Sequence, residues 1–212
     1  MAYNYYLYEE NGMLNLIPWD YNLAFGGFQG GSASETINFA IDTPFSSGIS
    51  TGDRQFFMAL LENETCLQQY HTYLRQLAEN YVQNGRPETV TASIRSRIDQ
   101  LAADDPTVFF TYEEYEDAAD MLLETIRLRA ESVLGQLDGI IPSTNEGQQQ
   151  DSASLIDASS IDLTVMGYMM GGGKGEREDV NQGFGRGGGQ DFSWGPSQDG
   201  SQNFNQDVSQ DG

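Results

Sequence analysis

Residues 3–28 read Y-N-Y-Y-L-Y-E-E-N-G-M-L-N-L-I-P-W-D-Y-N-L-A-F-G-G-F, and this stretch decides how the rest of the chain is interpreted. Two short runs typical of β-strands flank Asn11-Gly12, the dipeptide that most readily adopts the two positive φ angles of a type I′ turn. The second run ends at Pro18 and is followed by a single acid, Asp20, in a loop that contains glycine. The sequence therefore predicts a β-hairpin that presents one carboxylate where its second strand ends.

Asp20 is the main candidate for chemistry. Phosphoryl transfer depends on positioning and on cations that neutralise the charge of the phosphate oxygens. A carboxylate fixed beside a rigid hairpin would be a ligand for Mg²⁺ or Mn²⁺, because these hard cations prefer oxygen donors. The alternative is that Asp20 caps a turn through backbone hydrogen bonds, as Asp commonly does after a strand.

Asn4 is the second candidate metal ligand. In protein kinases an Asn and an Asp bracket the hairpin that holds the metal ions, and Asn4 and Asp20 bracket this hairpin in the same order. Both side chains are then expected at the open end of the hairpin. A hydrogen-bonded Asn at the edge of a strand is the alternative.

The charge balance limits the partners that the chain can have. There are 10 Lys and Arg residues against 32 Asp and Glu residues, for a formal net charge of −22. Such a surface repels phosphate backbones, so binding to nucleic acid is disfavoured, whereas cationic partners and divalent ions are compatible with it. The only cysteine, Cys66, excludes an internal disulfide, and the only histidine, His71, is interpreted as a packing or surface residue.

Membrane and export signals are missing from this sequence. No apolar run approaches the ~20 residues that a membrane-spanning helix needs. Met1 is followed by a strand, without the basic and apolar regions of a secretory signal. We therefore expect no membrane segment and no signal peptide in this chain.

Helical periodicity begins after a long connection, 25–52, whose Gly and Ser content predicts a surface loop. Asp53 is a candidate N-cap for a first helix and Asn63 for a second. In the second helix, apolar residues recur at spacings of three and four, which predicts one buried stripe that ends at Asn84-Gly85. The residues of this stripe are Leu67, Tyr70, Leu74, Leu77 and Tyr81.

Two further helices follow. Pro87 suits the first turn of the third helix, and Asp104-Asp105-Pro106 ends it. Thr111 opens the fourth helix through a capping box with Glu114. The residues expected to point inward are Val90, Ile94, Ile98 and Leu101 in the third helix, and Tyr115, Ala118, Leu122, Ile126 and Val133 in the fourth.

From Ser143 onward, Gln, Ser, Asp, Asn and Gly dominate, and too little apolar surface remains to offset chain entropy. We therefore expect residues 1–141 to fold and residues 142–212 to form a disordered tail. An apolar island at 155–170 would suit a short docking segment. Spaced aromatic residues are typical of weak self-association through the tail, and a non-binding linker is the alternative for both features. These aromatic residues are Phe184, Phe192, Trp194 and Phe204.

Several strings within residues 1–141 resemble the CotH family, the spore-coat protein kinases of bacteria and their secreted relatives. The most specific are N-Y-Y-L-Y-E-E-N-G at 4–12 and I-P-W-D-Y-N-L-A-F-G at 17–26. The resemblance continues through I-D-T-P at 41–44, D-R at 53–54, Y-H-x-Y-L at 70–74, D-P-T at 105–107, T-Y-E-E at 111–114 and R-A-E-S-V-L-G-Q-L at 129–137.

The resemblance implies an atypical protein-kinase-like fold that uses ATP with Mg or Mn to phosphorylate Ser on spore-coat or secreted proteins. In this family the motif Asp that corresponds to Asp20 would bind the metal. The nucleotide-binding lobe and the catalytic Asp of the family lie before the position matched by Met1. The chain therefore resembles the C-terminal part of such a kinase, and we expect it to be inactive alone. A spore-coat, extracellular or cell-surface location is implied by the resemblance.

Taken together, the sequence predicts an α+β fold: a β-hairpin and a helical C-lobe of an atypical kinase-like fold, followed by a disordered tail. The predicted function is that of a fragment of a CotH-like kinase with coat or secreted protein substrates. A non-enzymatic spore-coat or surface assembly protein is the alternative. A gene fragment with no independent role is the third reading.

Overall fold

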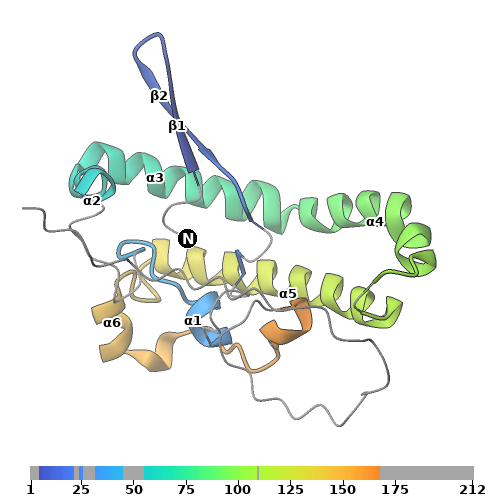
Figure 1. The fold of residues 1–212 in the computed structure, drawn as a ribbon. Helices are drawn as coiled ribbons and strands as arrows, with labels where there is room; N and C mark the ends of the chain where they lie inside the picture. Colours follow the sequence, from blue (N-terminus) through green and yellow to red (C-terminus); the bar gives the residue numbers. More distant parts are fainter. Residues whose placement is uncertain (1–4, 22–23, 26–31, 45–54, 109, 168–212) are drawn as a thin grey trace, which may run out of the picture. The chain divides into compact units, whose positions relative to one another are not determined.

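The computed structural model describes residues 5–21, 24–25, 32–44, 55–108 and 110–167 (Figure 1). The elements are the strands β1 (Tyr5–Glu10) and β2 (Met13–Pro18); the α-helices α1 (Ala33–Ile37), α2 (Gln55–Glu62), α3 (Glu64–Gln76), α4 (Arg86–Asp104), α5 (Tyr112–Leu137) and α6 (Asn145–Gln150); the π-helix η2 (Leu77–Gln83); and the 3₁₀ turns η3 (Ser152–Ser154) and η4 (Leu163–Met166). One antiparallel hairpin and a set of helices confirm the predicted α+β class.

The hairpin forms as the sequence predicts. Asn11 has φ 54° and Gly12 has φ 79°, the two left-handed residues that a type I′ turn requires. Glu10 pairs with Met13 next to the turn, and Tyr5 pairs with Pro18 at the open end. The large apolar side chains of both strands are exposed, and they are Tyr6, Leu7, Tyr8, Met13, Leu14, Leu16 and Ile17.

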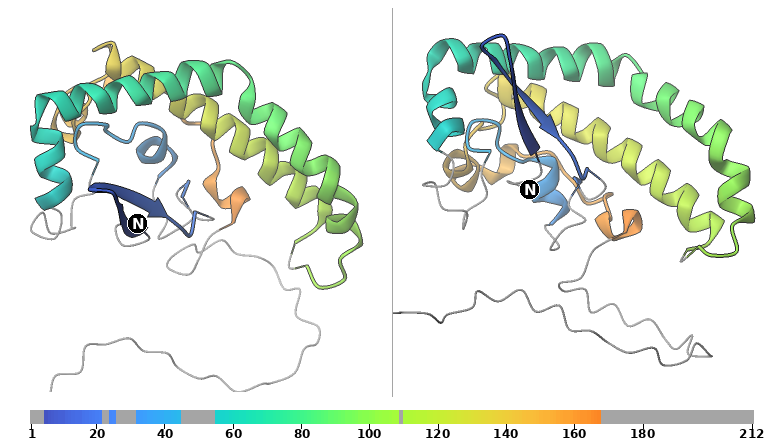
Figure 2. Two further views of the ribbon diagram at one scale, coloured as in Figure 1. Left: turned by 90° about the horizontal axis from the view of Figure 1, so that it is seen from above. Right: turned by 45° about the horizontal axis from the view of Figure 1, so that its top comes forward.

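Helix α5 is the element against which most of the others pack. Its N-terminus is fixed by the predicted capping box, in which Thr111 accepts from the N–H of Glu114 and the Glu114 carboxylate accepts from the N–H of Thr111. It ends before Gly139, which has φ 71°, the conformation that favours glycine after a helix. Helices α3, η2 and α4 run along α5, and α1 and η4 also pack against it (Figure 2).

Two groups of buried apolar residues make the core of the described chain. The first joins α1, α5 and the segment after α6, and it consists of Ile37, Leu128, Ala158, Ile161 and Leu163. The second joins the segment after α1 to η2 and the C-terminal half of α5, and it consists of Ile41, Ala78, Ala130 and Val133. The core therefore depends on residues from both sides of position 142.

The disorder predicted from residue 142 is wrong for residues 143–167. Ala158, Ile161 and Leu163 are each less than 10% exposed, and they pack on α5 and α1. The composition of this region is polar, but most of its apolar residues are buried or partly buried, and their tertiary contacts offset the chain entropy. The predicted division at 142 thus does not separate folded from unfolded chain. Residues 168–212 lie outside the described residues.

A helix in the predicted surface loop 25–52 is the second correction. Ser32 accepts from the N–H of Glu35, and the Glu35 carboxylate accepts from the N–H of Ser32, so a complete capping box starts α1. The Ser-x-x-Glu signature was present in the sequence, followed by the apolar residues of the core. Ile37 and Ile41 from this region are almost fully buried. The proposed cap Asp53 lies outside the described residues.

The apolar stripe predicted along 67–81 changes face where α3 becomes η2. Leu77 is 56% exposed and Tyr81 is 40% exposed, whereas Ala78 is buried and Val82 packs beside it. A π-helix has i→i+5 hydrogen bonds and more residues per turn than an α-helix. The inward face therefore moves one position along the chain, and the predicted inward orientation of Leu77 and Tyr81 is wrong.

The inward face predicted for α4 is also wrong at three of its four positions. Val90 is partly buried, but the other three residues are exposed, with Ile94 at 51%, Ile98 at 38% and Leu101 at 69%. The side of α4 that faces α5 carries Arg95, which pairs with a carboxylate of α5. Helical periodicity identifies an apolar face, but it does not say which neighbour covers that face.

Candidate functional site

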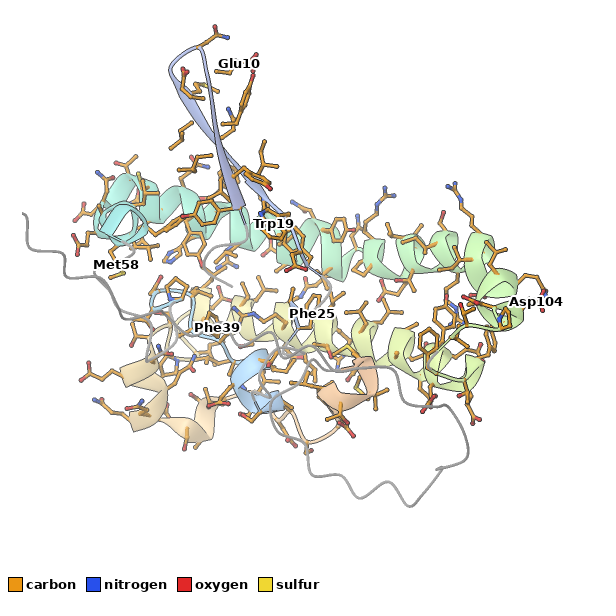
Figure 3. The ribbon with its side chains drawn as sticks, in the orientation of Figure 1. Glu10, Trp19, Phe25, Phe39, Met58 and Asp104 are labelled. Carbon is orange, nitrogen blue, oxygen red and sulfur yellow. The ribbon has the colours of Figure 1, made fainter. Side chains whose placement is uncertain are left out.

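Asp20 lies at the open end of the hairpin, two residues beyond the end of β2. Its side chain is exposed, and its backbone has φ 63°, a left-handed conformation that Asp tolerates better than most residues. The ring of Trp19 stacks on Tyr6, with centroids 6.1 Å apart and planes 25° apart. Figure 3 shows Trp19 at this end and Glu10 at the tip. The left-handed backbone at Asp20 and the stacked rings beside it together determine where the carboxylate projects.

The hairpin is joined to the helices by an aromatic contact at the same end. Tyr5 meets Phe57 of α2 edge to face, with ring centroids 5.8 Å apart. Offset or edge-to-face ring pairs of this kind stabilise a contact beyond the area that they bury. The open end of the hairpin, where Asp20 lies, is therefore attached to α2 through Tyr5, the first residue of β1.

Asp20 contributes one exposed carboxylate at the open end of the hairpin. Mg²⁺ usually takes one or two protein carboxylates and completes its shell with water and substrate phosphates. Within the described ranges, no three His, Cys, Asp or Glu side chains gather closely enough to hold a metal by themselves. One exposed carboxylate fits the first arrangement and not an all-protein cage. Asn4, the second predicted ligand, lies outside the described residues, so its part in the site stays a prediction.

The segment that follows α1 is held by a buried polar network that the sequence analysis missed. Asn38 is 2% exposed, and its amide donates to the carbonyls of Ser34 (3.1 Å) and Ile156 (3.0 Å). Its Oδ1 accepts from the N–H of Ile156 (2.9 Å) and from the hydroxyl of Ser132 (3.3 Å). One side chain thus joins α1, α5 and the chain beyond α6.

Gln136 extends this network along α5. Its Oε1 accepts from the N–H of Ile41 (3.0 Å), and its Nε2 donates to the hydroxyl of Ser132 (3.1 Å) and to the carbonyl of Phe39 (3.3 Å). Buried polar groups of a core are stable only when they find such partners. Gln136 therefore holds the backbone of Phe39 and Ile41 against α5.

Arg129 binds the same segment through one nitrogen. Its Nη1 donates to the carbonyls of Ile37 (3.0 Å) and Phe39 (2.7 Å). Burial lowers the pKa of the Arg129 guanidinium to about 10, because the charged form loses hydration. In the part of the chain that the structure describes, no carboxylate pairs with it. Arg129 is thus a partly buried cation whose guanidinium binds main-chain oxygens.

His71 pairs with Asp42 rather than lying alone. The Nε2 atom of His71 is 2.6 Å from Oδ1 of Asp42, and both side chains are partly exposed. The neighbouring Tyr70 donates from its hydroxyl to the carbonyl of Ile41 (3.1 Å), and burial raises the pKa of the Tyr70 phenol. The hydroxyl of Thr72, the next residue along α3, donates to the carbonyl of Gln68 (2.8 Å). These contacts attach the segment 41–44 to α3 and do not form a nucleophile–base pair.

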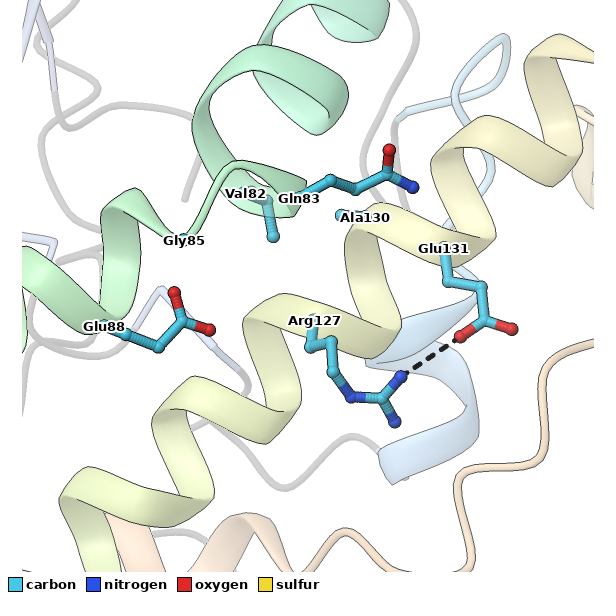
Figure 4. Close-up of a pocket in the computed structure, with 7 residues that line it drawn as sticks. All are labelled: Val82, Gln83, Gly85, Glu88, Arg127, Ala130 and Glu131. Carbon is cyan, nitrogen blue, oxygen red and sulfur yellow. Dashed lines mark hydrogen bonds and ion pairs between the residues drawn. The ribbon is translucent and has the colours of Figure 1, made fainter.

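A pocket of about 360 Å³ lies where η2 turns into α4 (Figure 4). Gly85 makes this turn with φ 73°. Arg127 binds Glu124 through two nitrogens (2.8 and 2.7 Å), so its charge is largely compensated. The lining residues are Val82, Gln83, Gly85, Glu88, Arg127, Ala130 and Glu131. Asp20 is not among them, and the lining offers no hydroxyl, thiol or amine nucleophile for a group transfer.

The polar groups that hold the segment after α1 had a signal in the sequence. Arg129, Ser132 and Gln136 follow one another at spacings of three and four, which places them on one face of a helix. That face also carries the apolar Val133 of the second core group. Polar residues at helical spacing inside an apolar stripe indicate a buried network, so this pattern in the sequence could have predicted the network.

Comparison with known proteins identifies one family. A family model described as CotH kinase protein matches residues 1–133. Neither the curated proteins nor the solved structures contain a match to the chain. None of the described helices combines the length and the apolar character that crossing a bilayer requires.

Proposed function

Because the chain belongs to the CotH kinase protein family, we propose that its hairpin supplies a metal ligand to a site that transfers the γ-phosphate of ATP to Ser of a protein. The proposed ligand is Asp20, with Asn4 as a second ligand. Coat or secreted proteins are the proposed substrates. The observation that supports the proposal is the exposed Asp20 carboxylate at the open end of the hairpin.

For phosphoryl transfer, the protein mainly has to position the reactants and neutralise the charge on the phosphate. In the transfer, the Ser oxygen forms a bond to the γ-phosphorus, the bond to the β–γ bridging oxygen breaks, ADP leaves, and the Ser proton passes to a base. A bound Mg²⁺ or Mn²⁺ would neutralise the charge on the phosphate oxygens. Asp20 would hold that cation, and the stacked Trp19 and Tyr6 rings would keep the carboxylate in place.

Metal binding by the chain itself is the first test. Mn²⁺ with ATP should broaden the backbone NMR signals of residues 18–21 in the wild-type chain, and Asp20→Asn should abolish that broadening. Glu10→Gln is the matched control, because it neutralises an exposed acid at the opposite end of the same hairpin. Equal broadening in wild type and Asp20→Asn would remove Asp20 from the metal site.

Phosphotransfer is the second test, made with the longest natural protein that contains this chain. The metal ion is worth several kcal/mol of transition-state stabilisation, so Asp20→Asn should lower the rate of phosphate transfer by about a hundredfold or more. Glu10→Gln should leave the rate unchanged. Activity that survives in Asp20→Asn would contradict the proposed function.

An assembly protein without catalysis is the second candidate. The observation that favours it is the exposed apolar surface of the hairpin, where residues of both strands lie in solvent. Contiguous exposed apolar patches commonly mark protein–protein contacts. Cross-linking of the chain with and without residues 168–212 distinguishes the assembly protein from the kinase. If the cross-linked partners are lost when residues 168–212 are removed, the chain assembles through this region.

A further inference from the structure

Helices α4 and α5 meet through polar side chains. Arg95 of α4 places Nη2 2.7 Å from Oε1 of Glu116, and the hydroxyl of Tyr115 donates to Oδ1 of Asp99 (3.0 Å). The Arg95 side chain is 22% exposed, and its guanidinium lies 5.6 Å from the centre of the Tyr115 ring. Ions, a phenol and an aromatic ring thus take part in the contact between the two helices.

The apolar face of α4 is left open by this arrangement. Ile94, Ile98 and Leu101, which we call the α4 stripe, follow one another at spacings of four and three and lie on one face of the helix. All three are exposed, and Leu101 is 69% exposed. Residues at these spacings are the anchors by which amphipathic helices pair with partners. A helix that faces its own fold with charges and solvent with aliphatic residues is suited to bind another protein.

The surroundings of the α4 stripe determine the charge of that partner. On α4 the exposed Arg97 lies between Ile94 and Leu101, whereas residues 99–120, from the last turns of α4 to the first turns of α5, contain eight acidic and no basic residues. Asp104 lies at the C-terminal end of α4 (Figure 3), and it is exposed together with Asp105. A partner that covers the Leu101 end of the α4 stripe therefore comes close to the exposed carboxylates of Asp104 and Asp105.

We propose that the α4 stripe binds a basic amphipathic helix of another protein. Aliphatic residues of that helix would contact Ile94, Ile98 and Leu101, and its Lys or Arg residues would face the carboxylates at the end of α4. A second copy is disfavoured as the occupant, because each copy has a net charge of −22. The region 168–212 is disfavoured too, because it has seven acidic and three basic residues.

Binding of a synthetic peptide tests this proposal. The probe is a fluorescent amphipathic helix of Leu and Lys, about 18 residues long so that it covers about five turns. One control peptide has the same residues in scrambled order, and another replaces Lys by Glu. Fluorescence anisotropy with the full chain should show at least about tenfold tighter binding of the amphipathic basic peptide than of either control. Added salt should weaken the binding, because exposed charges are screened.

Substitutions on α4 and η2 show where on the chain the peptide binds. Leu101→Gln keeps helix propensity but removes an apolar anchor, and it should weaken binding about tenfold. Leu77→Gln is the matched control, because Leu77 is an exposed Leu on η2, and it should leave binding unchanged. Hydrogen exchange of the full chain should show peptide-dependent protection over residues 90–104.

Three results would overturn the proposal. The first is equal binding of the scrambled peptide, and the second is unchanged affinity in Leu101→Gln. The third is a concentration-dependent dimer in sedimentation that Leu101→Gln dissociates, since a second copy would then cover the stripe. Circular dichroism of Leu101→Gln checks that helicity is retained, and Ile94→Gln repeats the measurement at a second anchor.

Discussion

Asn38→Ala is the substitution that tests the fold most directly. The Asn38 side chain makes four hydrogen bonds, and two of them join it to the N–H and the carbonyl of Ile156. Removal of the amide leaves both Ile156 groups without their partner and also takes an acceptor from Ser132. An unsatisfied buried polar group costs about 1–3 kcal/mol.

The expected loss follows from these contacts. Ile156 is partly exposed, so water can reach part of its backbone, and we take the lower half of the range for each of its two groups. The free energy of unfolding should then fall by about 3 kcal/mol, which is a large fraction of the 5–15 kcal/mol typical of a domain. With a denaturant dependence of about 2 kcal/mol per M, the urea midpoint should fall by about 1.5 M.

Urea unfolding followed by circular dichroism measures this change. Asn145→Ala is the matched control, because the exposed Asn145 amide makes one side-chain bond, to the carbonyl of Thr43 (3.2 Å), and its loss should cost less than about 1 kcal/mol. In hydrogen exchange, the Ile156 amide should lose protection in Asn38→Ala. A midpoint for Asn38→Ala equal to that of Asn145→Ala would refute the role assigned to the network.

Three further outcomes are expected. A chain that stops after residue 141 should lose cooperative unfolding because it lacks Ala158, Ile161 and Leu163, whereas a chain that stops after residue 167 should unfold like the full chain; both are checked by urea unfolding. Arg129→Lys should lower the free energy of unfolding by about 1–2 kcal/mol, because an ammonium is more strongly hydrated than a guanidinium and is therefore more costly to desolvate beside the two carbonyls. Hydrogen bonds from Ser32 lower the pKa of Glu35 below its ordinary value of 4.5. The bonds of that carboxylate therefore stabilise the fold fully above its ordinary pKa and are lost as the pH falls through the lower value, so the stability difference between wild type and Glu35→Gln should shrink from about pH 6 to about pH 3.

Local chemistry made part of this fold predictable from sequence. Asn11-Gly12 admits the positive φ angles of one turn type, and the Thr111–Glu114 box satisfies the free N–H groups of a helix start. Asn63 caps α3 in the same way, by accepting from the N–H of Cys66. Each of these signals acts within a few residues, so no knowledge of distant contacts is needed to interpret it. The same holds for the placement of Asp20 beyond β2.

Contacts between distant segments set the parts that sequence did not predict. The orientation of α4 depends on which residues of α5 lie opposite, and Arg95 finds Glu116 only after the two helices have packed. Residues 143–167 look polar along the chain, yet Ile161 and Leu163 reach the same core as Ile37 of α1. Composition averages over a window, whereas burial is decided residue by residue in three dimensions.

The core extends beyond the residues that define the family. The family match covers 1–133, whereas the carbonyl of Ser143 accepts from the N–H of Asp42 (2.9 Å), and the amide of Gln148 donates to the carbonyl of Asn38 (2.7 Å). Both bonds connect the chain after α5 to the segment after α1. Because a buried backbone group must find a partner, the segment after α1 would lose part of its bonding without residues 142–167. The folded unit is therefore longer than the matched region, and experiments on the proposed metal site require a chain that reaches at least residue 167.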